Sequence, residues 1–113
     1  MQSYQLHINL SANIEIVIWK LGKFTFPIGN YIYTGSAKKN IDARIERHKS
    51  KDKKMHWHID YLLNDKNTKI TEVQKFDEEE CILNQKASGE IIVAGFGSSD
   101  CKNGCKSHLK YLG

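Results

Sequence analysis

The chain of 113 residues has the length of one domain with a single hydrophobic core. Its formal net charge of +4 permits an anionic partner without requiring one. Apolar runs such as Ile16–Trp19 are far shorter than the ~20 residues of a membrane span, and the N-terminus lacks the basic start and apolar centre of a secretory signal. We therefore expect one cytoplasmic domain, residues 1–113, with no membrane association.

In chain order, alternating apolar residues predict four strands in the first third of the chain. The expected elements are a strand at Tyr4–Leu10, a turn at 11–13, a strand at Ile14–Trp19, a strand through Phe24 and Phe26 that Pro27 ends, and a strand through Tyr31 and Tyr33. The turn at 11–13 predicts that the first two strands pair as a hairpin. Gly35 and Ser36 are expected to end the fourth strand in a turn.

The segment Ile41–His48 predicts a helix with two i, i+4 pairs of different character. The apolar pair, Ile41 and Ile45, would seat the helix on the sheet. The second pair, Arg44 and His48, would then lie at the rim near the phenol of Tyr33. A guanidinium makes bidentate contacts to phosphate oxygens, and an imidazole or a phenol can move protons, so this set favours a site for a phosphate ester.

The remaining sequence predicts two helices and two strands. They are a short helix at His56–Leu63, a strand at Thr68–Phe76, a helix at Asp77–Lys86 with Asp77 as its N-cap, and a buried strand at Glu90–Ala94 before a glycine-rich turn. The fold class expected from these elements is α+β, a small, mainly antiparallel sheet flanked by helices. Lysine and arginine crowd residues 38–54, where they could add salt-sensitive attraction to nucleic acid.

Several of these segments together resemble a known family. The run Tyr33–Ser36, then Arg44 and His48 on one helix and a glutamate on a distant helix, resembles the GIY-YIG endonuclease superfamily. The segments 56–61 and 95–101 are similar to its small stand-alone microbial branch, which is related to Uri-type nucleases. The resemblance covers almost the whole chain, although the opening motif of the superfamily keeps only Tyr4.

The resemblance implies a role for each matching residue. Glu80 would be the single carboxylate that holds Mg²⁺ or Mn²⁺, with Glu79 as the alternative, and Arg44 would stabilise the charge of the transition state. Tyr4 or Tyr33 would accept a proton from the attacking water, helped by His48 or by a histidine beyond it, His58 in preference to His56. A phenol with a pKa near ~10 is a poor base at neutral pH, so Arg44 or the metal would have to lower that pKa.

Each of these residues also has a structural interpretation. The tyrosines could be packing residues of the sheet, Arg44 a solvated side chain, and His48 a hydrogen-bonded surface residue. Glu80 stands at capping-box distance from Asp77, which by itself accounts for an acidic residue there.

Three cysteines, an odd number, argue against a disulfide framework. Cys101, Cys105 and His108 have knuckle-like spacing, and Cys81 on the preceding helix could complete a structural Zn²⁺ site. The alternative is that Cys81 is a small core residue and the other two are reduced surface thiols.

The leading hypothesis is a metal-dependent endonuclease that hydrolyses phosphodiester bonds of DNA, with repair or the processing of structured or damaged DNA as its setting. A chain without an added recognition domain is expected to use a protein partner, a dimer or a distorted substrate for selectivity. The alternatives are a non-catalytic nucleic-acid-binding or scaffolding domain with a GIY-YIG-like fold, and a zinc module that binds protein.

Overall fold

The structure is a computed structural model that describes residues 2–37, 39–51, 53–97 and 105–113. Its elements are β1 (Gln2–Leu10), β2 (Ile14–Ile18), β3 (Gly22–Phe26), β4 (Gly29–Ala37), α1 (Ile41–Lys49), α2 (His58–Leu63), β5 (Thr68–Phe76), α3 (Glu80–Lys86) and β6 (Leu109–Tyr111). The predicted α+β class with a mainly antiparallel sheet is confirmed, because every strand pair in the described residues is antiparallel.

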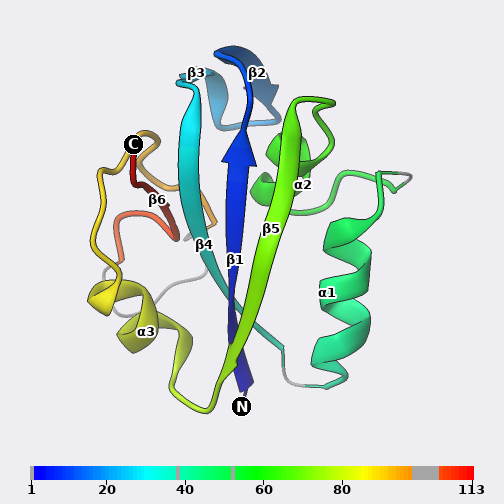
Figure 1. Ribbon diagram of the computed structural model, residues 1–113, viewed down its shortest axis with the longest axis vertical. Helices are drawn as coiled ribbons and strands as arrows, with labels where there is room; N and C mark the ends of the chain where they lie inside the picture. The colour runs from blue at the N-terminus through cyan, green and yellow to red at the C-terminus, as the bar shows by residue number, and fades with distance from the viewer. Residues whose placement is uncertain (1, 38, 52, 98–104) are drawn as a thin grey trace.

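The main sheet has the strand order β5-β1-β4-β6 (Figure 1). The central strand β1 buries its alternating apolar residues almost completely; they are Tyr4, Leu6, Ile8 and Leu10. The predicted hairpin between the first two strands is wrong, because β2 pairs with β3 in a separate two-stranded sheet. Both edges of β1 are taken by the nine-residue strands β4 and β5, which offer more backbone hydrogen bonds than the five-residue β2.

Strand β4 runs to Ala37 and does not turn at Gly35 and Ser36 as expected. Gly35 pairs with Tyr4 across the sheet, and a Cβ on Gly35 would lie only 2.6 Å from the Tyr4 ring and its hydroxyl oxygen. The glycine therefore serves a close approach: it leaves room for the Tyr4 side chain to lie over the β4 backbone.

Helices α1 and α3 flank the end of the sheet at which β1 begins and β4 finishes (Figure 1). Asn40 caps α1, since its side chain accepts the N–H of Ala43, and Ile41 and Ile45 are buried as predicted. Helix α3 starts at Glu80 with Glu79 as its N-cap, so the prediction of Asp77 as the cap is wrong. The carbonyl of Glu79 accepts the N–H of Leu83, and Asp77 lies before this first turn.

The predicted strand at 90–94 is absent from the described residues, where Glu90 makes only an isolated bridge to Tyr111. Residues 92–97 form bends and turns instead, and the apolar side chains of Val93 and Phe96 hold them to the core, since they are 1% and 0% exposed. The edge of β4 is occupied by β6, a strand of three residues that had no alternating pattern to predict it. In the part of the chain that the structure describes, no helix is long and apolar enough to cross a membrane.

Candidate active site

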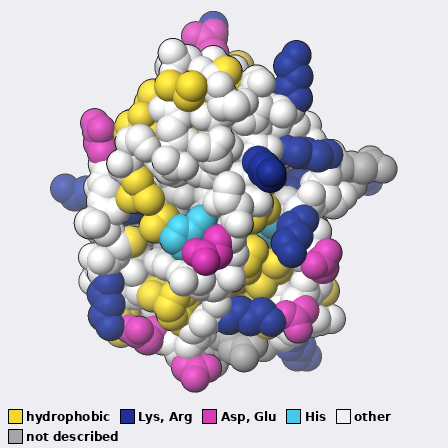
Figure 2. All heavy atoms as spheres, viewed as in Figure 1, with side chains coloured by type: hydrophobic (Ala, Val, Ile, Leu, Met, Phe, Trp, Pro, Cys, Tyr) yellow, Lys and Arg dark blue, Asp and Glu magenta, His cyan; other side chains and the backbone are white. Residues whose placement is uncertain are grey.

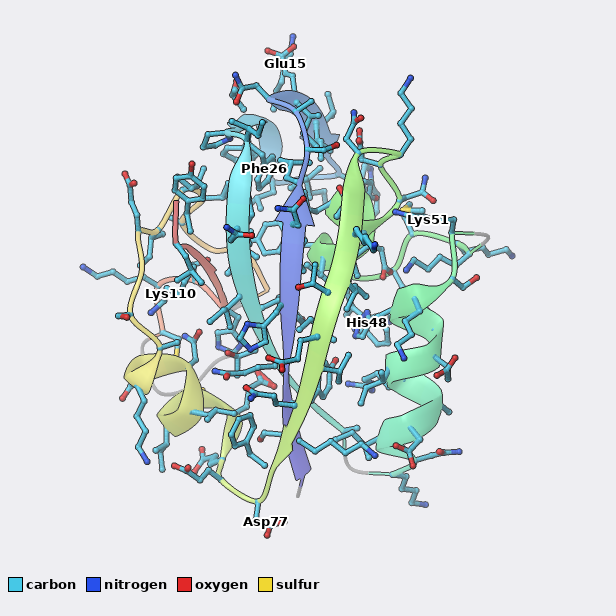
Figure 3. All side chains as sticks on the ribbon, viewed as in Figure 1. Glu15, Phe26, His48, Lys51, Asp77 and Lys110 are labelled. Carbon is cyan, nitrogen blue, oxygen red and sulfur yellow. The ribbon has the colours of Figure 1, made fainter. Side chains whose placement is uncertain are left out.

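Tyr4 and His48 form a buried hydrogen-bonded pair at the end of the sheet flanked by α1 and α3. The Tyr4 hydroxyl lies 2.6 Å from His48 Nε2, and the two residues are 1% and 2% exposed. Tyr33, two residues before Gly35 on β4, meets the His48 ring edge-on with centroids 6.1 Å apart. His48 therefore lies between α1 and the sheet (Figure 3) and not at the rim as the sequence predicted, because its i, i+4, i+7 spacing puts it on the same buried face of the helix as Ile41 and Ile45.

Burial sets the protonation of this group. It raises the pKa of Tyr4, and the opposing effect of the Arg44 charge is smaller; it also raises the pKa of Tyr33 well above its usual value. The lowering of a tyrosine pKa expected from the sequence is thus reversed. Burial lowers the pKa of His48 from 6.5 to about 4, so its imidazole is neutral at pH 7 and Nε2 can accept the Tyr4 proton.

Arg44 is held on two sides. Its guanidinium donates to the carbonyl oxygen of Ser36, and its Cζ lies 4.7 Å from the centre of the Trp57 ring. The guanidinium of Arg47 lies over the same ring, with Cζ 4.5 Å from its centre. These contacts keep Arg44 beside Tyr4 and reduce the conformational freedom that it would lose on binding an anion.

Glu80 is engaged at both carboxylate oxygens. Ser36 Oγ donates to Oε1 at 2.5 Å, and His108 Nδ1 lies 2.8 Å from Oε2. Burial alone would raise the pKa of Glu80, but the hydrogen bonds from His108 and Ser36 and the nearby Arg44 charge together lower it. Its side chain is 23% exposed, whereas the neighbouring Glu79 is exposed to solvent, so Glu80 is the carboxylate that faces the site.

Ser36 links the cation and the carboxylate, and sequence reasoning missed this role. Its carbonyl accepts from Arg44 while its hydroxyl donates to Glu80. The sequence predicts Ser36 to be part of a turn. Its position directly after Gly35 was the available signal.

His58 contacts the segment that packs against Tyr33, because Phe96 meets the Tyr33 ring with centroids 6.5 Å apart and a Cβ on Gly97 would lie 3.1 Å from that ring. His58 Nδ1 accepts the N–H of Gly97 at 3.0 Å, and the His58 ring packs against Phe96 with centroids 5.9 Å apart. His56 is exposed and packs edge-on against Trp57. His48 is therefore the histidine that the fold brings to Tyr4, while the role of His58 stays a prediction.

Asp60 is a second residue that sequence reasoning missed. It is fully buried and accepts two hydrogen bonds from Arg47, at 2.9 and 3.0 Å, together with the backbone N–H groups of His56 and Trp57. Burial alone would raise its pKa, but these bonds lower it. Its place in the first turn of α2 was the available signal, because a carboxylate there can accept the N–H groups that begin a helix. Asp60 fixes α1 to α2 and thereby positions Trp57 under Arg44.

Two lysines of the basic segment at residues 38–54 make hydrogen bonds to the backbone that support the fold. Lys51 Nζ donates to the carbonyl oxygens of Leu63, Asp65 and Thr68, and Lys53 Nζ donates to those of Arg47 and His48 at the end of α1. Other cations remain on the surface, and Figure 2 shows lysine and arginine gathered on the α1 side of the molecule. A hollow of about 210 Å³ opens there; its lining is His48, Lys49, Lys51, Leu63, Thr68, Lys69 and Ile70. This face suits the approach of an anionic polymer.

Cys81, Cys105 and His108 lie together beside Glu80. One donor atom from each of the three residues lies within 4.8 Å of the other two. Cys101, predicted from the sequence as a further ligand, lies outside the described residues.

A family model with the description "Domain of unknown function DUF123" matches residues 3–113. No curated protein and no solved structure matches the chain.

Proposed function

The chain belongs to the DUF123 family, and from the geometry of its site we propose that it is a divalent-metal-dependent endonuclease of the GIY-YIG type that hydrolyses phosphodiester bonds in DNA. The observation that carries the proposal is the double contact of Ser36. The Arg44 guanidinium and the Glu80 carboxylate are both hydrogen-bonded to this one residue. Tyr4, which is hydrogen-bonded to His48, lies near both, since the Arg44 charge lowers and the Glu80 charge raises the Tyr4 pKa. Phosphodiester hydrolysis needs a cation for the phosphate, a ligand for a metal and a proton acceptor, and the three are adjacent here.

The donor set at Glu80 fits Mg²⁺ or Mn²⁺. The lowered pKa of Glu80 keeps the carboxylate ionised. Oε1 accepts a hydrogen bond from Ser36 Oγ and Oε2 lies 2.8 Å from His108 Nδ1, which leaves lone pairs for a hard cation. One carboxylate suffices, because Mg²⁺ retains waters and takes further oxygens from a substrate phosphate. When bound, the ion would stabilise negative charge on the phosphate and on the leaving oxygen.

The Tyr4–His48 pair allows Tyr4 to accept a proton although the pKa of its phenol is high. Tyr4 Oη would take a proton from the attacking water while its own proton passes to His48 Nε2 over the 2.6 Å hydrogen bond. The hydroxide forms the new P–O bond, the bond to the leaving sugar oxygen breaks, and that oxygen is protonated from solvent. The imidazolium formed on His48 is favoured by the negative charge of Asp60, the strongest effect that raises the His48 pKa.

Arg44 would bind the phosphate through its guanidinium. Because Trp57 and the Ser36 carbonyl already fix that group, little further ordering is needed when the substrate binds. The positive charge stabilises the phosphate more strongly as negative charge grows in the transition state.

The test is cleavage of end-labelled duplex, flapped, bubble and single-stranded DNA with Mg²⁺ or Mn²⁺. We expect Glu80→Gln and Arg44→Ala each to slow cleavage by about 100-fold or more with folding intact. The matched control is Glu79→Ala, which removes the neighbouring exposed carboxylate and should cleave like the wild type. Cleavage that persists in both site variants, or that disappears in Glu79→Ala alone, would reject the assignment.

The cationic face around the 210 Å³ hollow favours a second candidate, a nucleic-acid-binding domain without catalysis. Such a domain would bind DNA with a salt-sensitive affinity that Glu80→Gln leaves unchanged, and it would cleave none of the substrates with either metal.

A further inference from the structure

The cluster of Cys81, Cys105 and His108 has the chemistry and spacing of a metal site. Cys81 lies in the first turn of α3, while Cys105 and His108 precede β6, so the fold joins two distant parts of the chain. The donor atoms are within 4.8 Å of one another, and Cys81 and His108 are 8% and 1% exposed. In a tetrahedral site with Zn–S bonds of ~2.3 Å, ligand sulfurs are ~3.8 Å apart, so small side-chain movements would bring the three donors to tetrahedral spacing, with the fourth position open to another ligand.

Two thiolates and an imidazole select zinc over magnesium, because soft sulfur ligands bind Zn²⁺ strongly while Mg²⁺ prefers oxygen. Cys105 Sγ also lies 4.0 Å from the carbonyl oxygen of Cys81 and 3.9 Å from Gln85 Nε2. A hydrophobic role for Cys81 and these weak sulfur contacts do not require an imidazole as a third donor at the same point, whereas a zinc site does. From these three side chains we infer a zinc site that is separate from the Mg²⁺ or Mn²⁺ position proposed at Glu80.

His108 connects the two positions. Its Nδ1 is 2.8 Å from Glu80 Oε2, so Nε2 is the nitrogen that would bind zinc. A metal on Nε2 fixes the imidazole in the form that carries its proton on Nδ1, and that N–H then donates to the carboxylate. The arrangement is a carboxylate–histidine–zinc triad in which the carboxylate is itself the proposed metal ligand of the nuclease site.

The backbone around His108 is already fixed for this role. Its N–H donates to the carbonyl of Phe96 at 2.9 Å, and its own carbonyl accepts from Thr34 on β4 at 3.0 Å. Asn84 Nδ2 on α3 donates to the carbonyl of Ser107 at 2.8 Å, which ties the helix carrying Cys81 to the segment carrying His108. The cluster therefore sits on elements that the fold holds together.

His108 would then be a positioning residue for Glu80, and this second step rests on the proposed nuclease function. Ser36 holds one oxygen of Glu80 and zinc-bound His108 the other, so the carboxylate would point in one direction for its own metal. The zinc site itself stands independently of any cleavage activity.

The first experiment measures metal content in protein prepared without a histidine tag from zinc-supplemented medium. We expect about one zinc per wild-type chain, at least a fivefold loss in Cys105→Ser and in His108→Ala, and full retention in Glu79→Ala. The last variant is the matched control, because it removes an exposed carboxylate from the same segment and leaves Glu80 and the three ligands in place. Wild-type protein without zinc, or zinc retained in both ligand variants, would overturn the site.

A second measurement covers variants that fail to fold. Co²⁺ added to metal-stripped wild type should give the strong thiolate-to-cobalt absorption band and the visible bands of tetrahedral cobalt, and zinc should displace both. Absence of the thiolate band would overturn the site in the native chain without any substitution.

The link to Glu80 is tested by the Mg²⁺ concentration that gives half-maximal cleavage. Removing zinc should raise that concentration by about 10-fold or more, with the cleavage rate recovering at saturating Mg²⁺. An unchanged Mg²⁺ requirement after verified zinc loss would overturn the positioning role. If no cleavage is seen at all while zinc binds in one equivalent, the nuclease proposal fails and the zinc site stands.

Discussion

The two ends of the β1–β4 strand pair differ in kind although both are buried. At one end Leu10, Ile18 and Phe26 are 0% exposed, and the β2–β3 sheet packs there (Figure 1). At the other end polar side chains are buried together with apolar ones: Ser3 and Thr34 are 0% exposed, and Tyr4 is hydrogen-bonded to His48 of α1. Burying a polar group without a hydrogen-bond partner costs free energy. The polar end is therefore held together by hydrogen bonds, whereas the apolar end is held together by packing.

The two tyrosines of β4 illustrate the difference. Tyr31 and Tyr33 lie on one face of one strand, two residues apart. The Tyr31 hydroxyl donates a hydrogen bond to the carbonyl oxygen of Pro27, and its ring packs against Tyr111. The Tyr33 ring instead packs edge-on against His48. Equal local patterns therefore serve packing at one end and the candidate site at the other.

The largest effect on stability is expected from Asp60→Ala. The substitution removes four hydrogen bonds from a fully buried carboxylate and leaves Arg47 and Lys53 without it. Loss of one partner of a buried ion pair costs about 3–5 kcal/mol, measurable as a lower urea midpoint. Asp65→Ala is the control on the same segment. A loss no larger than that of the control would contradict the structural role assigned to Asp60.

The second-largest effect on stability is expected from acid, which should lower the unfolding free energy through His48. Because burial lowers the His48 pKa from 6.5 to about 4, the unfolded chain binds a proton between these values and the folded chain does not. The contribution of His48 is therefore complete above pH 6.5 and is lost as the pH falls toward 4, by on the order of 3 kcal/mol. Urea unfolding of wild type and His48→Gln across this range isolates the effect, since glutamine can still accept from Tyr4. Parallel pH profiles would refute it.

Gly35→Ala probes the close approach of Tyr4 to β4. The new Cβ would lie 2.6 Å from the Tyr4 ring, so the ring must move away from His48. We expect a loss of about 1–3 kcal/mol in unfolding free energy together with a loss of cleavage. In the Tyr4→Leu background the same glycine substitution should cost less, and additive costs in the double-mutant cycle would show that the two residues are not in contact.

The smallest effect on stability is expected from removing a single tyrosine hydroxyl, in Tyr4→Phe and in Tyr31→Phe. Each change removes one hydroxyl hydrogen bond and should lower the unfolding free energy by about 1 kcal/mol. Only Tyr4→Phe should reduce cleavage, because only that hydroxyl contacts His48. Equal loss of cleavage in the two variants would remove the distinction between the two ends of the sheet.

The sequence by itself determined the elements in which local periodicity is strong. The alternation of β1, the bounds of β5, and the buried Ile41 and Ile45 of α1 follow from residue spacing, which states which face of an element is apolar. The same spacing placed Arg44 and His48 on adjacent turns of one helix. A family resemblance then selected Tyr4 and Glu80 from the other polar residues.

Only the tertiary structure decided which edges pair and which polar groups meet. Period-two alternation does not say which strand lies beside β1, so the expected hairpin with β2 was wrong and the three-residue β6 was not foreseen. The contacts of Ser36 with Arg44 and Glu80, and of Asp60 with Arg47, join different elements, and Ser36 and Glu80 are 44 residues apart in the chain. Such contacts depend on how whole elements pack, because burial obliges polar groups to find partners wherever the fold supplies them.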